Sequence, residues 1–225
     1  MMYSPEVFMH IYGRLLERFG PRFWWPAETP FEVCVGAILT QNTAWTNVEK
    51  AIIALKQSAI MTPVAIREIE QESLARLIRP AGYFNIKSLR LKDFVAWLFL
   101  HHQGSLEQMF SGEWQTLRTE LLLVRGIGPE TADSILLYAG NKPSFVVDAY
   151  TRRLFHRLGL LSEDAGYNET RALCMSHLPA NAWLFNEYHA LIVEQCKQFC
   201  RKKPLCRECP LIDVCLFNKT IACSR

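Results

Sequence analysis

The sequence predicts an all-α protein, and three observations support this fold class. Apolar residues recur every three to four positions through most of the chain, which is the spacing that forms one face of an α-helix. Proline and glycine interrupt these stretches repeatedly, as expected for short turns between helices. The only plausible strand, Ser144–Val147, is too short to build a sheet.

Four helices show the pattern most clearly. The first has an apolar face over Phe8–Phe19, and the second over Val48–Leu55. A third apolar face spans Leu91–Leu98. A fourth helix holds Leu191 and Val193, shortly before a cysteine-rich segment.

Length and composition exclude several classes of protein. The 225 residues can bury a core as one large domain or two small ones. With 50% hydrophobic and 21% charged residues, the chain is neither disordered nor collagen-like. The longest apolar run, Phe94–Leu100, is too short for a membrane span, and no secretory leader is recognisable. We therefore expect a cytoplasmic protein with no membrane partner, whose net charge of +3 permits a polyanionic ligand without requiring one.

A glycine-rich turn joins two amphipathic helices, and Pro129 follows it at a first helical position. Glycine lets a backbone come close to a ligand, and the amides at a helix start can donate to a phosphate. The pattern indicates a helix–hairpin–helix, which grips a DNA backbone without reading its sequence. A lone Gly-x-Gly also occurs in ordinary tight turns between helices. The candidate backbone contacts are Arg125, Gly126, Ile127, Gly128 and Thr131.

Asp148 stands at the start of the next helix. Taken alone, it is best explained as an N-cap, a position that aspartate favours. The helix behind it has a basic cluster, for which a solvated face is the simple explanation: Arg152, Arg153 and Arg157.

Six of the eight cysteines lie in the last thirty residues, which speaks against a disulfide framework spread over the chain. Their spacing of C-x5-C-x2-C-x5-C is typical of a metal centre. A single C-x2-C with a five-residue loop on each side favours a [4Fe–4S] cluster, while zinc remains the alternative. The expected ligands are Cys200, Cys206, Cys209 and Cys215. Cys196 competes with Cys200 for the first position, Cys223 is spare, and Cys34 and Cys174 read as small buried hydrophobes.

Together, the hairpin, an aspartate about twenty residues later and the four-cysteine segment resemble the endonuclease III branch of the helix–hairpin–helix DNA glycosylases. The resemblance covers essentially the whole chain. It implies two helical domains that flank a DNA-binding cleft. One is a six-helix barrel with the hairpin, over residues 22–140, and the other joins residues 1–21 to residues 141–225 with the iron–sulfur cluster. The implied partner of this monomer is double-stranded DNA with a damaged base.

The resemblance extends to Leu39–Thr43, which is similar to the family's segment that fills the gap left by a flipped base. Gln41 and Asn42 are its candidate DNA contacts. The segment Gly82–Lys87 also resembles the family.

The chain departs from the family at two places. Bifunctional members have a lysine two residues after the second glycine, whose amine forms a Schiff base with the sugar. This sequence has Glu130 there, and a carboxylate cannot form that imine, so the resemblance implies a monofunctional glycosylase. The first cysteine gap is five residues, where six is usual in the family.

Within this superfamily, the chain resembles most the 3-methyladenine DNA glycosylase III group, through Phe23–Pro26, Leu39–Thr43 and the Glu130/Asp148 pair. Aromatic residues near these positions line that group's pocket for the extruded base. An N3-methylated adenine is cationic, and indole faces attract flat cations. The matching residues here are Trp24, Trp25, Pro26 and Trp45, for each of which core packing is the alternative.

The implied mechanism has Asp148 stabilise the developing sugar cation and position water. Glu130 orients water or shapes the pocket, and Lys202 and Lys203 add contacts to the DNA backbone. The alternatives are a bifunctional glycosylase and AP lyase acting on oxidised pyrimidines, a mismatch-directed glycosylase, and a non-catalytic DNA-binding module.

Overall fold

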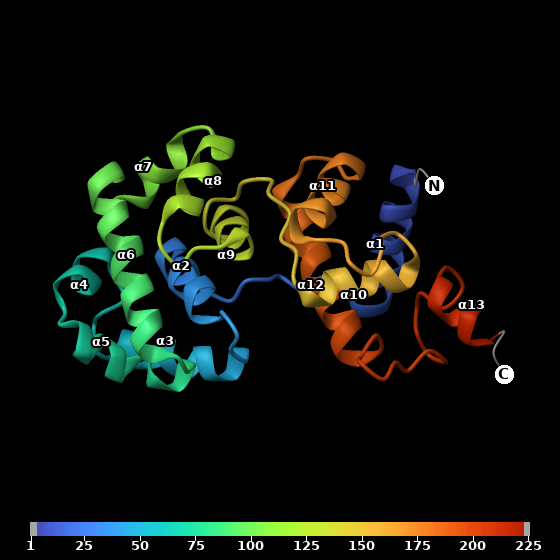
Figure 1. Ribbon diagram of the computed structural model, residues 1–225, viewed down its shortest axis with the longest axis horizontal. Helices are drawn as coiled ribbons and strands as arrows, with labels where there is room; N and C mark the ends of the chain where they lie inside the picture. The colour runs from blue at the N-terminus through green and yellow to red at the C-terminus, as the bar shows by residue number, and fades with distance from the viewer. Residues whose placement is uncertain (1–3, 223–225) are drawn as a thin grey trace. The chain divides into compact units, whose positions relative to one another are not determined.

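The computed structural model describes residues 4–222, without the side chains of residues 220–222. Within this range all regular secondary structure is helical and there is no strand, which confirms the predicted all-α class (Figure 1). Ser144–Val147 is coil. No helix among these residues is long and apolar enough to cross a membrane. The elements are α1 (Pro5–Phe19), α2 (Pro30–Leu39), α3 (Trp45–Gln57), α4 (Pro63–Glu68), α5 (Gln71–Leu77), η1 (Arg79–Ala81), α6 (Phe84–His102), α7 (Leu106–Ser111), α8 (Trp114–Leu123), α9 (Pro129–Ser134), η2 (Ile135–Ala139), α10 (Ala149–Leu158), α11 (Tyr167–His177), α12 (Ala182–Gln198) and α13 (Leu216–Ala222).

The chain divides into two compact units. One is continuous and spans Trp25–Lys142. We call it the hairpin unit, because it holds α8 and α9. The other combines the chain up to Trp24 with the chain from Pro143 onward, and we call it the cysteine unit.

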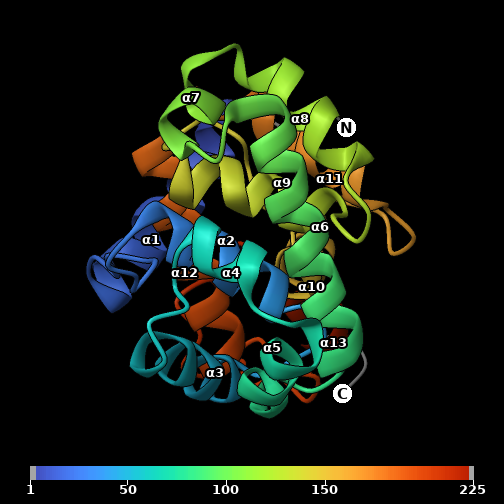
Figure 2. The same ribbon diagram turned by 90° about the vertical axis from the view of Figure 1, so that its left-hand side faces the viewer.

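The hairpin unit is built around α2. Thr29 caps this helix by accepting a hydrogen bond from the Glu32 amide, and Pro30 occupies its first turn. Every residue from Phe31 to Leu39 is buried, so α2 is the central helix of the unit rather than a surface one. It contacts α3, α6, α9 and η2. Figure 2 shows the long helix α6 beside α4 and α5, both of which it contacts.

The cysteine unit is built around α12, which packs on α1 and α10. Its core is aromatic: the rings of Phe8 and Phe155 lie edge to face, with centroids 5.7 Å apart. The buried Tyr188 hydroxyl donates to the Phe8 carbonyl at 2.9 Å, which joins α12 to α1 across most of the sequence. After α12 the chain forms turns through the cysteine segment and ends in α13, which contacts α10.

Candidate functional site

The predicted hairpin is present. Helix α8 ends at Leu123, α9 begins at Pro129, and Gly128 is the N-cap of α9. Gly126 has a φ of +84°, and a Cβ atom there would lie 2.4 Å from the Arg90 side chain. Both its backbone angle and the packing of Arg90 therefore require glycine. Ile127 is buried, whereas Arg125 and Gly128 are exposed.

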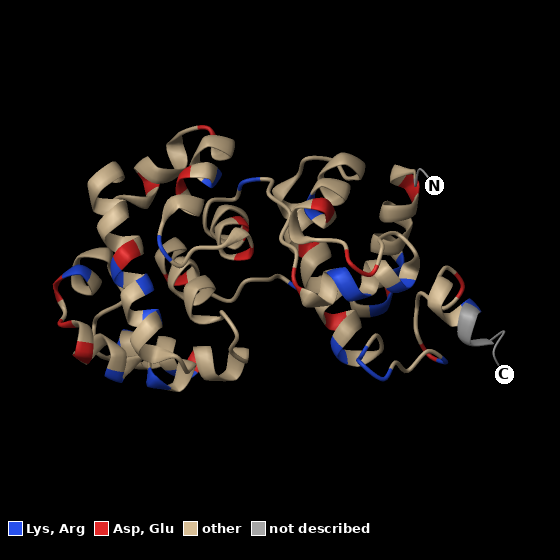
Figure 3. Cartoon of the chain, viewed as in Figure 1, with Lys and Arg blue, Asp and Glu red and all other residues tan. Residues whose placement is uncertain are grey.

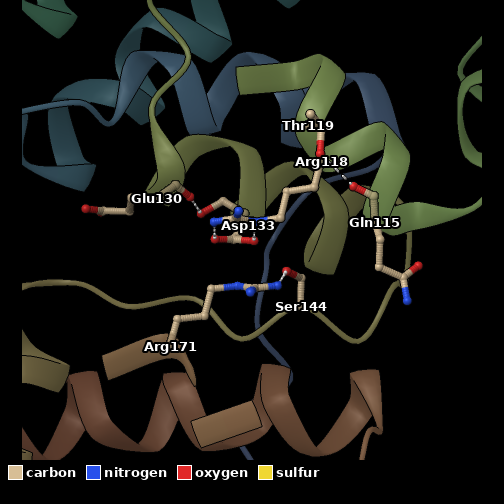
Figure 4. A network of polar contacts seen from close by, with 8 residues as sticks. Gln115, Arg118, Thr119, Glu130, Asp133, Ser144 and Arg171 are labelled. Carbon is tan, nitrogen blue, oxygen red and sulfur yellow. Dashed lines mark hydrogen bonds and ion pairs between the residues drawn. The ribbon is translucent and has the colours of Figure 1, made fainter. Parts of the chain in front are cut away.

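An ion pair joins the two hairpin helices. Arg118 on α8 donates to both carboxylate oxygens of Asp133 on α9, at 2.7 and 2.9 Å (Figure 4). The Asp133 side chain is fully buried. Sequence reasoning missed this pair, because its partners are fifteen residues apart and either one alone reads as a surface charge. Glu130, by contrast, is exposed at the start of α9.

The Leu39–Thr43 segment lies against the hairpin turn. The Gln41 amide nitrogen donates to the Gly126 carbonyl and to the Thr131 hydroxyl, both at 2.9 Å. Arg90 donates in turn to the Gln41 amide oxygen. Gln41 is thus held by the hairpin, and the Thr131 side chain, buried and bonded to Gln41, faces inward. The neighbouring Asn42 is exposed, with a φ of +54°.

An aromatic cluster lies in the hairpin unit. Trp25 and Trp45 meet edge to face with ring centroids 5.0 Å apart, and Tyr138 lies 5.1 Å from Trp25 on another side. A Cβ atom at Gly36 would lie 3.1 Å from the Trp25 ring, so this glycine makes room for the indole. All three rings are partly exposed. The structure therefore brings Trp25 and Trp45 into contact.

Tyr138 was missed by the sequence analysis. It belongs to the π-helical turn η2, in which one extra residue per turn moves side chains off the face that a 3.6-residue period assigns. Trp24 falls in the cysteine unit, where the Lys197 ammonium lies 5.8 Å from its ring centroid. Pro26 is exposed.

Asp148 is the N-cap of α10, as expected for an aspartate at the start of a helix. Its Oδ1 accepts from the Thr151 amide at 2.7 Å and from the Thr151 hydroxyl at 3.0 Å. Its Oδ2 lies 3.6 Å from Nε2 of the buried His189 on α12. The cap therefore uses one carboxylate oxygen, and the other faces His189.

The Asp148 carboxyl is held in its ionised form. Burial alone would raise its pKa, but the interaction with His189 and the hydrogen bonds from Thr151 outweigh it, so the pKa lies below its usual value. The coil before Asp148 is fixed as well, because Arg171 on α11 donates to the buried Ser144 hydroxyl at 2.8 Å (Figure 4). His189 was not singled out in the sequence, since a histidine inside an apolar helix carries no local signal.

The four predicted cysteine ligands line one cavity in the cysteine unit. This cavity is partly open to solvent. Its other walls include Leu158, Phe199, Leu211 and Phe217. The cavity lining includes Cys200, Cys206, Cys209 and Cys215. Cys196 is absent from that lining, and its sulfur lies 3.5 Å from the Tyr150 carbonyl.

Two side chains donate toward the sulfurs of this cavity. Gln195 donates to the Cys209 sulfur at 3.0 Å, and Arg157 to the Cys200 sulfur at 3.3 Å. Hydrogen bonds from Cys196 and from Arg157 lower the pKa of Cys200 to about 6. Such donors stabilise a thiolate, which is the form that binds metal. No three His, Cys, Asp or Glu side chains within the described part of the chain are arranged to hold one metal ion.

The basic residues near this cavity divide into two groups. Arg153 donates to the Cys200 carbonyl at 2.9 Å, and Arg157 donates to the carbonyls of Arg201 and Lys202 at 2.6 and 3.1 Å. These arginines hold the cysteine segment, in contrast to the solvated face expected from the sequence. Lys202 and Lys203 are exposed on the loop after α12. Figure 3 shows basic residues in this loop.

The other cysteines are as expected where the structure describes them. Cys34 and Cys174 are fully buried, and burial raises the pKa of both thiols. They are inert core residues. Cys223 lies outside the described residues.

The comparisons with a family profile, with related sequences and with solved structures agree with one another. The sequence profile described as "HhH-GPD superfamily base excision DNA repair protein" matches residues 35–180. A Methanocaldococcus jannaschii protein with the provisional name DNA repair glycosylase is 50% identical over 213 residues, which cover 94% of this chain and 96% of that one. Endonuclease III of Thermotoga maritima is 29% identical over 84% of both chains.

Two solved structures are similar to the whole chain. The H. pylori 3-methyladenine DNA glycosylase MagIII bound to 1,N6-ethenoadenine has a TM-score of 0.75 and 32% identity, covering 88% of this chain and 98% of that one. An endonuclease III trapped covalently on DNA has a TM-score of 0.84 at 22% identity, covering 98% of this chain and 100% of the other. The second likeness concerns the fold alone.

Proposed function

Because the chain belongs to the HhH-GPD superfamily of base excision DNA repair proteins, we propose that it is a monofunctional DNA glycosylase for alkylated purines, with 3-methyladenine as the first candidate. It would hydrolyse the bond between the damaged base and its sugar and leave an abasic site. The observation that supports the substrate class best is the cluster of Trp25, Trp45 and Tyr138.

Aromatic rings suit a methylated purine for a physical reason. Methylation at N3 gives adenine a positive charge, and the negative face of an aromatic ring attracts a flat cation. A similar solved structure is a 3-methyladenine glycosylase with a bound purine. In our proposal Trp25 and Trp45 line the pocket, Tyr138 braces Trp25, and Pro26 follows Trp25 at the pocket edge.

The base has to leave the DNA stack before its glycosidic bond can be reached. We assign Gln41 and Asn42 to the gap that it leaves. Asn42 is already exposed, whereas Gln41 would have to exchange its hydrogen bonds to Gly126 and Thr131 for contacts with DNA. Each such bond contributes about 0.5–1.5 kcal/mol to stability. Hydrogen bonds to DNA of similar strength would offset this loss.

Asp148 is the proposed catalytic carboxylate. A cationic base is already a good leaving group, so the enzyme mainly has to stabilise the positive charge that develops on the sugar. An ionised Oδ2 does this and can accept a proton from the attacking water, as carboxylates do in glycoside hydrolysis. His189 keeps the carboxylate ionised. Glu130 supplies no amine for a Schiff base and is assigned to water orientation.

DNA backbone contacts are assigned to the hairpin and to the cysteine segment. In this proposal the amides of Gly126 and Gly128 and the side chain of Arg125 face a phosphate. The amide of the buried Ile127 instead donates to the Val124 carbonyl at 3.0 Å, and Thr131 supports the turn from inside. Lys202 and Lys203 add charge, which makes the affinity depend on salt.

The four-cysteine cavity fits a [4Fe–4S] cluster. A cubane takes one thiolate on each iron, so its ligands are spread more widely than those of one zinc ion. Four cysteines around a shared cavity are compatible with this wider arrangement. We assign Cys200, Cys206, Cys209 and Cys215 as ligands. The cluster, when bound, orders the loop that bears Lys202 and Lys203.

The test is an excision assay on a panel of duplexes with alkylated, oxidised and mismatched bases, each scored with and without alkali. We expect release of alkylated purines and strand breaks only after alkali. Borohydride should trap no protein–DNA adduct. Strand nicking without alkali, or a trapped adduct, would show a bifunctional enzyme, and intact DNA on every duplex would leave only a DNA-binding role.

A further inference from the structure

Lys87 is a buried lysine in the first turn of α6, with only 1% of its surface exposed. Its ammonium donates three hydrogen bonds, to the Leu39 carbonyl at 2.7 Å, the Thr43 hydroxyl at 2.5 Å and the Ala81 carbonyl at 2.8 Å. All three acceptors are uncharged. Burial, with a contribution from the Arg90 charge, lowers the pKa of Lys87 to about 8. Keeping a cation here costs free energy, which the three hydrogen bonds have to offset.

Two of the three acceptors lie at the ends of helices. Leu39 is the last residue of α2, and Ala81 is the last residue of η1. Carbonyls at helix C-termini lack intrahelical partners and form the negative end of the helix dipole. One ammonium therefore caps two helices at once. The Thr43 hydroxyl closes the arrangement, because it also donates to the Ala81 carbonyl at 2.6 Å.

Each of these helix ends leads directly into an exposed loop tip. After α2 comes Asn42, with a φ of +54°, and after η1 comes Tyr83, with a φ of +47° and 69% of its surface exposed. Positive φ values are unfavourable for non-glycine residues and persist only where the surroundings impose them. Lys87 contacts the backbone at the base of both loops. It holds the two tips at a fixed spacing within the hairpin unit.

We propose that Lys87 is a positioning residue for base extrusion, which holds the Thr40–Ala44 loop and the Gly82–Tyr83 loop as one rigid surface that meets the DNA. This inference rests on the proposed function, in which Gln41 and Asn42 fill the gap. Lys87 touches neither base nor sugar. It acts by fixing the loop bases before DNA arrives, so that no ordering entropy is lost when the gap is filled.

The same helix provides a matched control. Lys92 donates to the carbonyl of Arg67 in the last turn of α4, at 2.9 Å, and to that of Ile69, the C-cap of α4. Burial lowers the pKa of Lys92 as well. Lys92→Met thus removes a comparable set of lysine–carbonyl bonds from α6 without touching either loop tip.

The test uses the full-length protein with its native metal content and a duplex that carries a tetrahydrofuran abasic-site analogue next to 2-aminopurine. Fluorescence of 2-aminopurine reports insertion into the gap, and anisotropy reports affinity. We expect Lys87→Met to slow insertion by about tenfold while the Kd changes by less than about threefold, because the phosphate contacts remain. Lys92→Met should insert at the wild-type rate. Equal insertion rates for wild type, Lys87→Met and Lys92→Met would overturn the inference.

Thr43→Val covers the case in which Lys87→Met does not fold. It removes the hydroxyl link and should slow insertion in the same direction, by a smaller factor; a wild-type rate would count against the inference. The assay is independent of excision. A wild-type protein that inserts into the gap but excises no base refutes the proposed function, whereas an excising enzyme with unchanged insertion in both variants refutes the role of Lys87.

Discussion

The hairpin and the cysteine segment are both short and rich in turns, but different contacts hold them. Side chains of the hairpin unit fix the hairpin: Arg118 and Asp133 join its helices, and Gln41 bonds its turn. The cysteine segment is held from outside by arginines of α10, and its four candidate ligands face a cavity. The comparison teaches that the hairpin is held by side chains of its own unit, whereas the cysteine segment lines a cavity that, in our proposal, a cluster fills.

The largest effect should follow from removing one cluster ligand. We expect Cys206→Ser to lose iron and visible absorbance, and to lower the thermal midpoint by roughly 10 °C or more, because the segment has little core of its own. Cys174→Ala, which removes a buried thiol elsewhere in the same unit, should keep its full iron content. Iron analysis and thermal unfolding check both variants. Equal iron in Cys206→Ser and wild type would contradict the ligand assignment.

In the hairpin unit the corresponding break is the Arg118–Asp133 pair. Asp133→Ala leaves a largely buried guanidinium without its carboxylate, and we expect a loss of about 3–5 kcal/mol in the free energy of unfolding. Replacing both partners by Arg118→Met and Asp133→Leu should cost less, since no buried charge is left. Urea unfolding measures both. A double variant as unstable as Asp133→Ala would show that the pair matters through packing and not through charge.

The aromatic cluster should distinguish substrates by charge. We expect Trp45→Leu to reduce kcat/KM for a cationic 3-methyladenine duplex by about tenfold, corresponding to a cation–π contribution of about 1–2 kcal/mol. A neutral damaged base such as hypoxanthine should lose less, because only area is removed. The ratio of the two kcat/KM values is the measurement. An unchanged ratio would assign Trp45 to packing.

The smallest effect concerns the exposed lysines of the cysteine segment. Lys202→Ala with Lys203→Ala should weaken DNA binding severalfold and reduce the salt slope of the affinity by roughly one per lysine. Arg76→Ala, an exposed charge of the hairpin unit, is the control and should leave the slope unchanged. Binding titrations at several salt concentrations decide between them, and an unchanged slope in the double variant would remove this segment from the DNA interface.

Local patterns predicted the helical class, the hairpin turn and the four cysteines around one cavity. These features depend on periodicity, glycine positions and spacing, all of which are visible within a short window. Tyr138, His189 and the Arg118–Asp133 pair were missed for the opposite reason. A π-helical turn shifts Tyr138 off its expected face, and the other residues gain meaning only from partners distant in the sequence.

The basic cluster on α10 shows the same limit. Arg152, Arg153 and Arg157 are indistinguishable in the sequence, yet Arg153 and Arg157 bond carbonyls of the cysteine segment. Whether a guanidinium of α10 donates to a carbonyl depends on where the cysteine segment, distant in the sequence, packs against that helix. Charge counting cannot show this.

The central claim is that the Asp148 carboxylate performs chemistry beyond capping α10, and Asp148→Asn tests it most directly. Asparagine caps helices as well as aspartate does, so folding and DNA affinity should remain close to wild type. The negative charge is lost, so single-turnover excision of the alkylated purine should fall by about a thousandfold or more. Excision near the wild-type rate, or an equal loss of excision and DNA binding, would contradict the account.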